Sequence, residues 1–161
     1  IERGLLDVGL LQEPVDISKY SFVRTPCREQ WGVLVREDSE LASRERVSPA
    51  DLASVPLILP EREIVQNELL NWFGPYAEGL RITATGNLLY NLASLARASG
   101  GSVLTLNLDC TYEGLRFIPL SPPLESNTVL VWKKTQTFSA AAAALIEFSE
   151  KYISGMEQNL I

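Results

Sequence analysis

The sequence predicts an α/β protein that divides into two lobes. Apolar runs typical of strands alternate along the chain with stretches of helical apolar spacing, which is the order expected of a sheet covered by helices. Proline-marked transitions near Val55 and at Pro119–Pro123 separate an inner segment from two outer ones. We therefore expect one lobe from residues 1–55 and 121–161 and a second lobe from residues 56–120.

The chain begins with Ile1–Gly4, which we interpret as the last turn of a helix closed by a glycine cap. The nearly continuous apolar run Leu5–Leu11 follows, and such a run is typical of a strand covered on both faces. There is no initiator Met and no start to that first helix, so we interpret the chain as a module of a longer protein. After a polar loop, Phe22–Pro26 and Trp31–Arg36 predict two strands separated by a polar turn.

The inner segment contains clear helix signals. Ser48 and Pro49 supply an N-cap and a first-turn proline for a short helix over residues 49–53. Val55–Leu59 predicts a strand, and the apolar spacing from Ile64 to Phe73 predicts a helix that ends at the Gly74-Pro75 pair.

The remaining elements follow the same alternation. Leu80–Thr85 predicts a strand, and the polar residues after it lead into a helix whose apolar stripe includes Leu88 and Leu92 and which ends at Gly100-Gly101. Further strands are expected at residues 102–106, 115–120 and 128–133, and an amphipathic helix is expected from Ser139 to about Ile153.

Composition excludes several classes of function. With 14 basic and 20 acidic side chains, the chain lacks the clustered positive charge of a nucleic-acid surface. Its longest apolar stretch, Ala140–Ile146, is far too short to span a membrane. Two isolated cysteines, Cys27 and Cys110, indicate buried thiols in a reducing compartment and therefore a cytoplasmic protein.

The chain has no histidine, and this narrows its chemistry. Ser-His-Asp and Cys-His catalytic pairs and His-ligated zinc are excluded, and no glycine-rich phosphate-binding motif is present. We assign no catalytic residue, no metal ligand and no cofactor. An enzyme that uses carboxylates or a lysine stays open as an alternative, although no motif supports it.

Several stretches resemble the effector-binding domain of LysR-type transcriptional regulators, which is similar to type II periplasmic binding proteins. Gly4–Leu10 is similar to the family's "G-x-lD-l-G-l" strand, and Trp31–Ala42 to its "lvlv…hPLa" stretch, with Ser39-Glu40 in place of the usual His-Pro. Val47–Leu52 resembles the "v…dL" helix entry. Leu95–Val103 resembles the "lVaaG.Gi" helix exit, although Ser99 stands where glycine is common.

This resemblance implies two Rossmann-like lobes joined by two crossover segments, with the first lobe incomplete. It implies a small-molecule effector bound between the lobes, and DNA binding only through a helix-turn-helix domain that this chain lacks. A homodimer is implied, and a tetramer in the intact regulator. Because the lobe's first strand would be missing, the strand at Leu5–Leu11 would have an unpaired apolar edge. We expect the isolated chain either to associate through that edge or to order its first lobe poorly.

The resemblance also places the residues that would bind the effector at the ends of strands and at the starts of helices. The loop after the inner lobe's first strand supplies one wall, a polar helix entry supplies the second, and the end of the opening strand faces them across the cleft. Free amides at a helix start favour a carboxylate. The candidates are Gln12, Pro60, Glu61, Arg62, Thr85, Asn87 and Thr105.

Plainer interpretations of these residues stay open. Thr85 and Asn87 are also suited to ordinary helix capping, and Arg62 to a solvated loop between two glutamates. The tryptophans are interpreted as anchors of the core or of an interface, and the helix Ile64–Phe73 is a candidate for the dimer interface because it carries Trp72 and Phe73. The alternative function is a periplasmic-type solute-binding protein, which an upstream secretion signal would favour.

Overall fold

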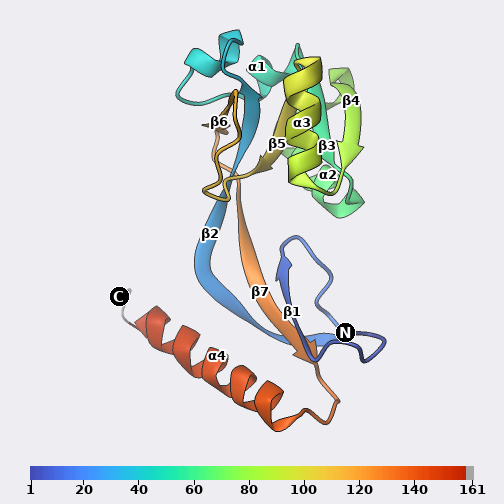
Figure 1. Cartoon of the computed structure of the whole chain (residues 1–161), viewed down its shortest axis with the longest axis vertical. Coiled ribbons are helices and arrows are strands. Elements are labelled where there is room, and N and C mark those ends of the chain that lie inside the picture. Colours follow the sequence, from blue (N-terminus) through green and yellow to red (C-terminus); the bar gives the residue numbers. More distant parts are fainter. Residues whose placement is uncertain (159–161) are drawn as a thin grey trace. The chain divides into compact units, whose positions relative to one another are not determined.

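The computed structural model describes residues 1–158 and divides the chain into two compact units. Unit 1 contains Ile1–Arg28 and the chain from Ser126 onward, and unit 2 contains Glu29–Glu125. Both units combine strands with helices, so the predicted α/β class is confirmed (Figure 1). No helix in the described residues is long and apolar enough to cross a membrane.

Unit 2 is built on a mixed sheet. Its order is β6-β2-β5-β3-β4. β3 is parallel to both β4 and β5, while β2 is antiparallel to β5 and β6. The strands are β2 (Tyr20–Arg36), β3 (Pro56–Pro60), β4 (Arg81–Gly86), β5 (Ser102–Leu106) and β6 (Leu115–Pro119).

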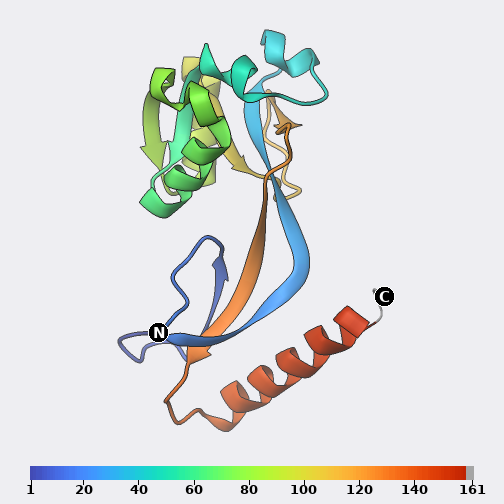
Figure 2. The ribbon, with the colours of Figure 1, turned by 180° about the vertical axis from the view of Figure 1, so that it is seen from behind.

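Helices cover both faces of this sheet. α1 (Pro49–Ala53) and α2 (Glu63–Phe73) lie on one face, and α3 (Leu89–Ser99) lies on the other, as the opposite views of Figures 1 and 2 show. Two short 3₁₀ helices, η1 (Glu40–Ser43) and η2 (Gly74–Gly79), complete the unit. The parallel strands β3 and β5 are therefore covered on both faces, which explains their continuous apolar runs, whereas β4 at the margin of the sheet is largely exposed.

The two cores of unit 2 follow the alternation of the strands. Leu57 and Leu59 of β3 belong to the cluster that includes Leu69 and Phe73 of α2. Ile58, between them, belongs to the other cluster, with Ala96 of α3. Successive side chains of a strand point to opposite faces, so one short apolar strand supplies both cores.

Unit 1 contains the first part of β2 together with β1 (Val8–Gln12), β7 (Glu125–Lys133) and α4 (Ala140–Gln158). β1 pairs antiparallel with β7 from Val8↔Trp132 to Gln12↔Thr128. The side-chain oxygen of Ser139 accepts from the amide of Ala142 at 3.2 Å and so caps α4.

The prediction of two strands between Phe22 and Arg36 was wrong, because β2 is one strand of 17 residues. No glycine or asparagine lies in the segment Cys27–Gln30, so nothing there favours the turn conformations that end a strand. The second part of β2 is instead held in unit 2, where Trp31 donates its amide to Leu124 O at 2.8 Å.

The first residues also differ from expectation. Ile1–Gly4 form a turn, in which the Gly4 amide donates to Ile1 O at 2.9 Å, and not the end of a helix. Gly4 does adopt a left-handed φ of 71°. β1 starts at Val8, so Leu5 and Leu6 lie outside the strand and are exposed.

Three further expectations differ from the observed packing. Cys27 and Cys110 are both exposed, so the prediction of buried thiols was wrong. Phe73 is 1% exposed, which removes it as an interface residue, whereas Trp72 is only partly buried against the same core. The contacts place residues 29–55 in unit 2, since β2 pairs there with β5 and β6, whereas the sequence assigned that segment to the first lobe.

Candidate functional site

The carboxyl ends of β3, β4 and β5 form one edge of the unit 2 sheet. β3 and β4 are parallel, and their last residues, Pro60 and Gly86, are register partners. The amide of Glu61 donates to Gly86 O at 2.9 Å, so the two loops that follow these strands are joined directly. β5 runs parallel to β3 on its other side and brings Thr105 to the same edge.

Two helices begin at this edge. Arg62 is the N-cap of α2 and Leu88 is the N-cap of α3, and neither side chain accepts a hydrogen bond from its helix. The first amides of a helix have no acceptor within the helix, and the helix dipole adds a partial positive potential there. The edge therefore presents two uncapped helix starts, an arrangement that suits a carboxylate or another small anion.

Two contacts within unit 2 position the strand ends and helix starts at this edge. The side-chain amide of Gln66 in the first turns of α2 donates to Pro60 O at 2.7 Å. At Gly86, a Cβ atom would lie 2.6 Å from a methyl carbon of Leu92, so glycine allows α3 to pack close to the end of β4. Both contacts fix where the helix starts lie relative to the strand ends.

The charged groups at the edge are solvent-exposed. Glu61, Arg62 and Glu63 are consecutive exposed residues, with two negative charges to one positive. The neutral side chains of Thr85 and Asn87 are also exposed, while Thr105 is only 9% exposed. No group of three or more His, Cys, Asp or Glu residues that could hold a metal ion occurs in the part of the chain that is described.

Six of the seven predicted residues lie at this edge. They are Pro60, Glu61, Arg62, Thr85, Asn87 and Thr105. The seventh, Gln12, ends β1 in unit 1 and pairs with Thr128. The capping alternative for Thr85 and Asn87 was wrong, because α3 has Leu88 as its N-cap.

Sequence reasoning missed several parts of this edge. Leu88 could not be recognised as an N-cap, since leucine is a poor capping residue. Gln66 carries no signal of its own beyond its position one turn into α2. The loop after β5 was also missed, although Asn107, whose side chain accepts from the amide of Asp109 at 3.1 Å, and Asp109, at a left-handed φ of 51°, are typical of such turns.

Comparisons with known proteins are consistent with this architecture. The chain is similar to a putative LysR family transcriptional regulator from Pseudomonas aeruginosa, with a TM-score of 0.73 and 19% identity over 95% of this chain. It is also similar to the Synechocystis PCC6803 CcmR regulatory domain in complex with 2-PG, with a TM-score of 0.77 and 12% identity, covering 96% of this chain and 77% of that one.

The effector-binding domain of QuiR in complex with shikimate gives a TM-score of 0.78 and 15% identity, covering 96% of this chain and 75% of that one. The match spans 56% of the Pseudomonas regulator. No curated protein sequence matches the chain. The family model described as the LysR substrate binding domain matches residues 1–153, which is nearly the whole sequence. The chain therefore belongs to the LysR substrate-binding domain family.

Proposed function

We propose that the chain is the effector-sensing domain of a LysR-type transcriptional regulator and that it binds a small carboxylate at the carboxyl ends of β3, β4 and β5. The observation that carries this proposal is the pair of uncapped helix starts, α2 and α3, joined at one edge by the Glu61 amide and Gly86 O. The solved complexes of related domains with shikimate and with 2-PG support a small-molecule ligand.

The ligand would act by differential binding. A molecule that binds one conformation more tightly than another shifts the population toward it by the difference in binding free energy. In the intact regulator that bias would pass through a homodimer or tetramer to a DNA-binding domain elsewhere in the protein. The domain itself would work in the cytoplasm, without catalysis and without a cofactor.

A thermal unfolding screen with small carboxylates, shikimate among them, tests the proposal. A ligand present at about 100 times its Kd stabilises a protein by about 2.7 kcal/mol, which is readily measured. We expect at least one carboxylate to raise the Tm, and the double variant Arg62→Ala/Asn87→Ala to lose that rise. Arg81→Ala is the matched control, because Arg81 is an exposed arginine at the opposite end of β4.

Two outcomes would contradict the proposal. If the double variant is stabilised as strongly as the unchanged chain, Arg62 and Asn87 do not belong to the site. If the bound carboxylate is converted to a product during prolonged incubation, as followed by one-dimensional NMR of the ligand, the domain is an enzyme and not a sensor.

A further inference from the structure

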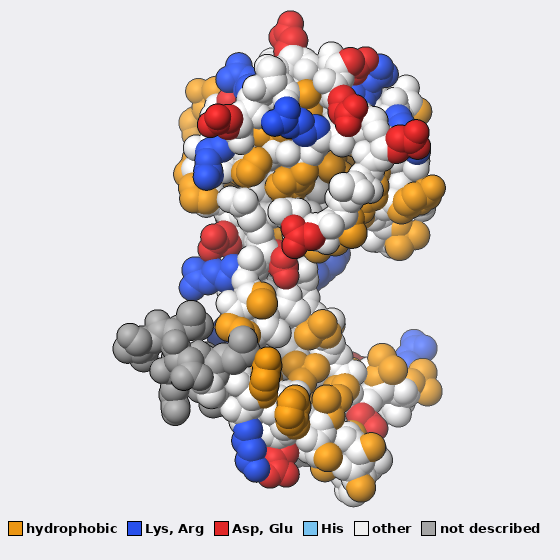
Figure 3. All heavy atoms as spheres, turned by 60° about the vertical axis from the view of Figure 1, so that its left-hand side comes forward, with side chains coloured by type: hydrophobic (Ala, Val, Ile, Leu, Met, Phe, Trp, Pro, Cys, Tyr) orange, Lys and Arg blue, Asp and Glu red, His pale blue; other side chains and the backbone are white. Residues whose placement is uncertain are grey.

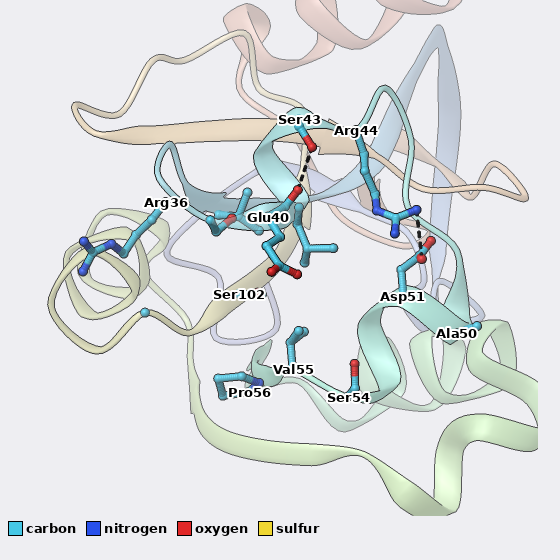
Figure 4. Close-up of a pocket in the computed structure, with 14 residues that line it drawn as sticks. Arg36, Glu40, Ser43, Arg44, Ala50, Asp51, Ser54, Val55, Pro56 and Ser102 are labelled. Atoms are coloured by element: carbon cyan, nitrogen blue, oxygen red, sulfur yellow. Dashed lines mark hydrogen bonds and ion pairs between the residues drawn. The ribbon is translucent and has the colours of Figure 1, made fainter.

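Unit 2 contains a cavity of about 710 Å³ at the end of the sheet opposite the candidate effector site. Its walls come from the end of β2, from η1 and α1, from the first residues of β3 and β5, and from Gly100 after α3 (Figure 4). Pro56 and Ser102, which start β3 and β5, mark the amino ends of these parallel strands. Small-molecule pockets have volumes of roughly 300–1,000 Å³, so this cavity is large enough for one.

The positive charges at this cavity already have partners. The guanidinium of Arg36 donates to the carboxylate of Asp38 at 2.9 and 2.5 Å. Arg44 forms an ion pair with Asp51 at 3.1 Å, drawn as a dashed line in Figure 4. Each arginine is thus neutralised locally, and neither is left to attract an anion.

Glu40 is the exception among the charged lining residues. Its side chain extends from η1 toward the wall that carries Ser54 and Val55 (Figure 4). Within the described residues its carboxylate forms no ion pair, and it is exposed. The four lining charges therefore sum to zero, and Asp38, which binds Arg36 outside the lining, leaves one net negative charge near the cavity.

Uncharged groups at the cavity add hydrogen-bond acceptor oxygens, whose partial charges are also negative. α3 ends at the cavity with Gly100 as its C-cap, and the last carbonyls of a helix carry partial negative charge. Ser54, the C-cap of α1, lines the same space, as does Ser102, a residue that is 4% exposed. The hydroxyl of Ser39, another lining residue, is buried and has no hydrogen-bond partner within residues 1–158.

We propose that this cavity binds a small hydroxylated amine, such as an amino sugar or amino alcohol. The ammonium group pairs with the carboxylate of Glu40 and with carbonyl oxygens at the end of α3, and the ligand's hydroxyls bond to the serine side chains. The uncompensated carboxylate sets the charge of the ligand, and the several hydroxyls set its polarity. This site lies at the other end of the strands from the proposed carboxylate site, and its ligand has the opposite charge.

An NMR titration of the full chain with D-glucosamine, at a pH where its amine is protonated, tests the proposal. We expect saturable amide shifts in residues 39–44, 54–56 and 100–102. D-glucose has the same ring and hydroxyls without the charge, and gluconate is an anionic control. Both should bind several-fold more weakly than glucosamine, because neither offers Glu40 a cation.

Glu40→Gln removes the charge and keeps the size of the side chain. Glucosamine affinity should fall about fivefold, since a partly exposed ion pair contributes up to about 1 kcal/mol. Glu45→Gln, an exposed glutamate on the same segment outside the cavity, should bind as the unchanged chain does. Because Glu40 is exposed, its variant should fold normally, which its own spectrum verifies.

Three results would overturn the proposal. The first is the absence of saturable shifts around the cavity with glucosamine. The second is binding of glucose as tight as that of glucosamine. The third is unchanged glucosamine affinity in a folded Glu40→Gln variant. The outcome does not depend on whether a carboxylate binds at the other edge, so each site can fail alone.

Discussion

Gly32 lies in the segment of β2 that pairs with β6. Its register partner on β6 is Pro119, and its neighbour Val33 is fully buried. A Cβ atom at position 32 would lie 2.6 Å from Ile118 O and closer still to the ring of Phe117. The Phe117 ring could rotate away, but the Ile118 carbonyl belongs to the backbone of a paired strand and cannot move without breaking the pairing.

We therefore expect Gly32→Ala to lower the free energy of unfolding by about 1–3 kcal/mol, as other overpacked sites do. Urea unfolding followed by tryptophan fluorescence measures this directly. Gly79→Ala is the control, because a Cβ there meets no atom within 4 Å, and its stability should change little. Equal stability of the two variants would show that β6 moves freely against β2.

For single residues, the sequence predicted the burial of the tryptophans better than that of the cysteines. Trp31 and Trp132 are 3% and 7% exposed, as expected for core anchors, because a large apolar ring gains most from burial. Free cysteine is usually buried, but its side chain is small and gains little from burial, so the local environment decides whether it is buried or exposed. Cys27 lies on a stretch of β2 with exposed neighbours, and Cys110 lies in the loop after β5.

Among the elements, α1 owes its start to a capping box. The hydroxyl of Ser48 accepts from the amide of Asp51 at 3.3 Å, and the carboxylate of Asp51 accepts from the amide of Ser48 at 2.8 Å. Hydrogen bonds from the Ser48 side chain and amide, with the nearby Arg44 charge, lower the pKa of Asp51 below its ordinary value of 3.8. The ionised carboxylate is thus favoured in the folded state.

Asp51→Ala should lower the free energy of unfolding by about 1 kcal/mol near neutral pH, the usual value of a lost cap. A depressed folded-state pKa contributes stability above the unfolded value, and this contribution is lost as the pH falls through the folded value. The difference between the two proteins should therefore shrink below about pH 3.8. Urea unfolding over a pH series measures it.

Glu45→Ala serves as the control for this series, because Glu45 is an exposed carboxylate outside the capping box. Its stability difference should be small at every pH. A constant difference for Asp51→Ala down to strong acid would mean that the charge of Asp51 contributes nothing and that the effect is one of helix propensity alone.

Elements with strong local signals could be predicted closely. The sequence placed α1 at residues 49–53 and β5 at residues 102–106, which are their observed bounds. β2 could not be predicted as one strand, because its second half is extended by pairing with distant residues of β5 and β6. The candidate site residues came from the family resemblance, which places them at strand ends and helix starts, and the ends of parallel strands meet at one edge of a sheet. The N-cap at Leu88 was missed, because leucine is a poor capping residue.

In the molecule as a whole, the buried apolar surface is divided unequally between the two units. Both buried apolar clusters, including the one around Leu57, Leu69 and Phe73, lie entirely within unit 2. Unit 1 buries few large side chains, among them Val129, Val131, Trp132, Ile146 and Ile153, as the burial of the described residues shows. Unit 2 should accordingly hold most of the folding free energy.

Unit 1 also exposes many apolar side chains. Leu5, Leu6 and Leu10 are 82%, 60% and 66% exposed, and β1 is the edge strand beside β7. On α4, Phe148 and Tyr152 are 64% and 57% exposed, and their rings stack at 5.6 Å. Hydrophobic side chains gather on the face of unit 1 shown in Figure 3. Exposed apolar groups beside an open strand edge favour association.

We therefore expect the isolated chain either to associate with a second copy through unit 1 or to exchange the amide hydrogens of unit 1 far faster than those of β3 and β5. Light scattering over a concentration series and hydrogen exchange measure the two alternatives on one sample. Leu10→Lys places a charge on the exposed face of β1 and should lower any association, whereas Lys19→Leu, on the loop before β2, should not. A monodisperse monomer with equally slow exchange in both units would contradict this prediction, because it would mean that the few buried side chains of unit 1 stabilise it as well as the two clusters stabilise unit 2.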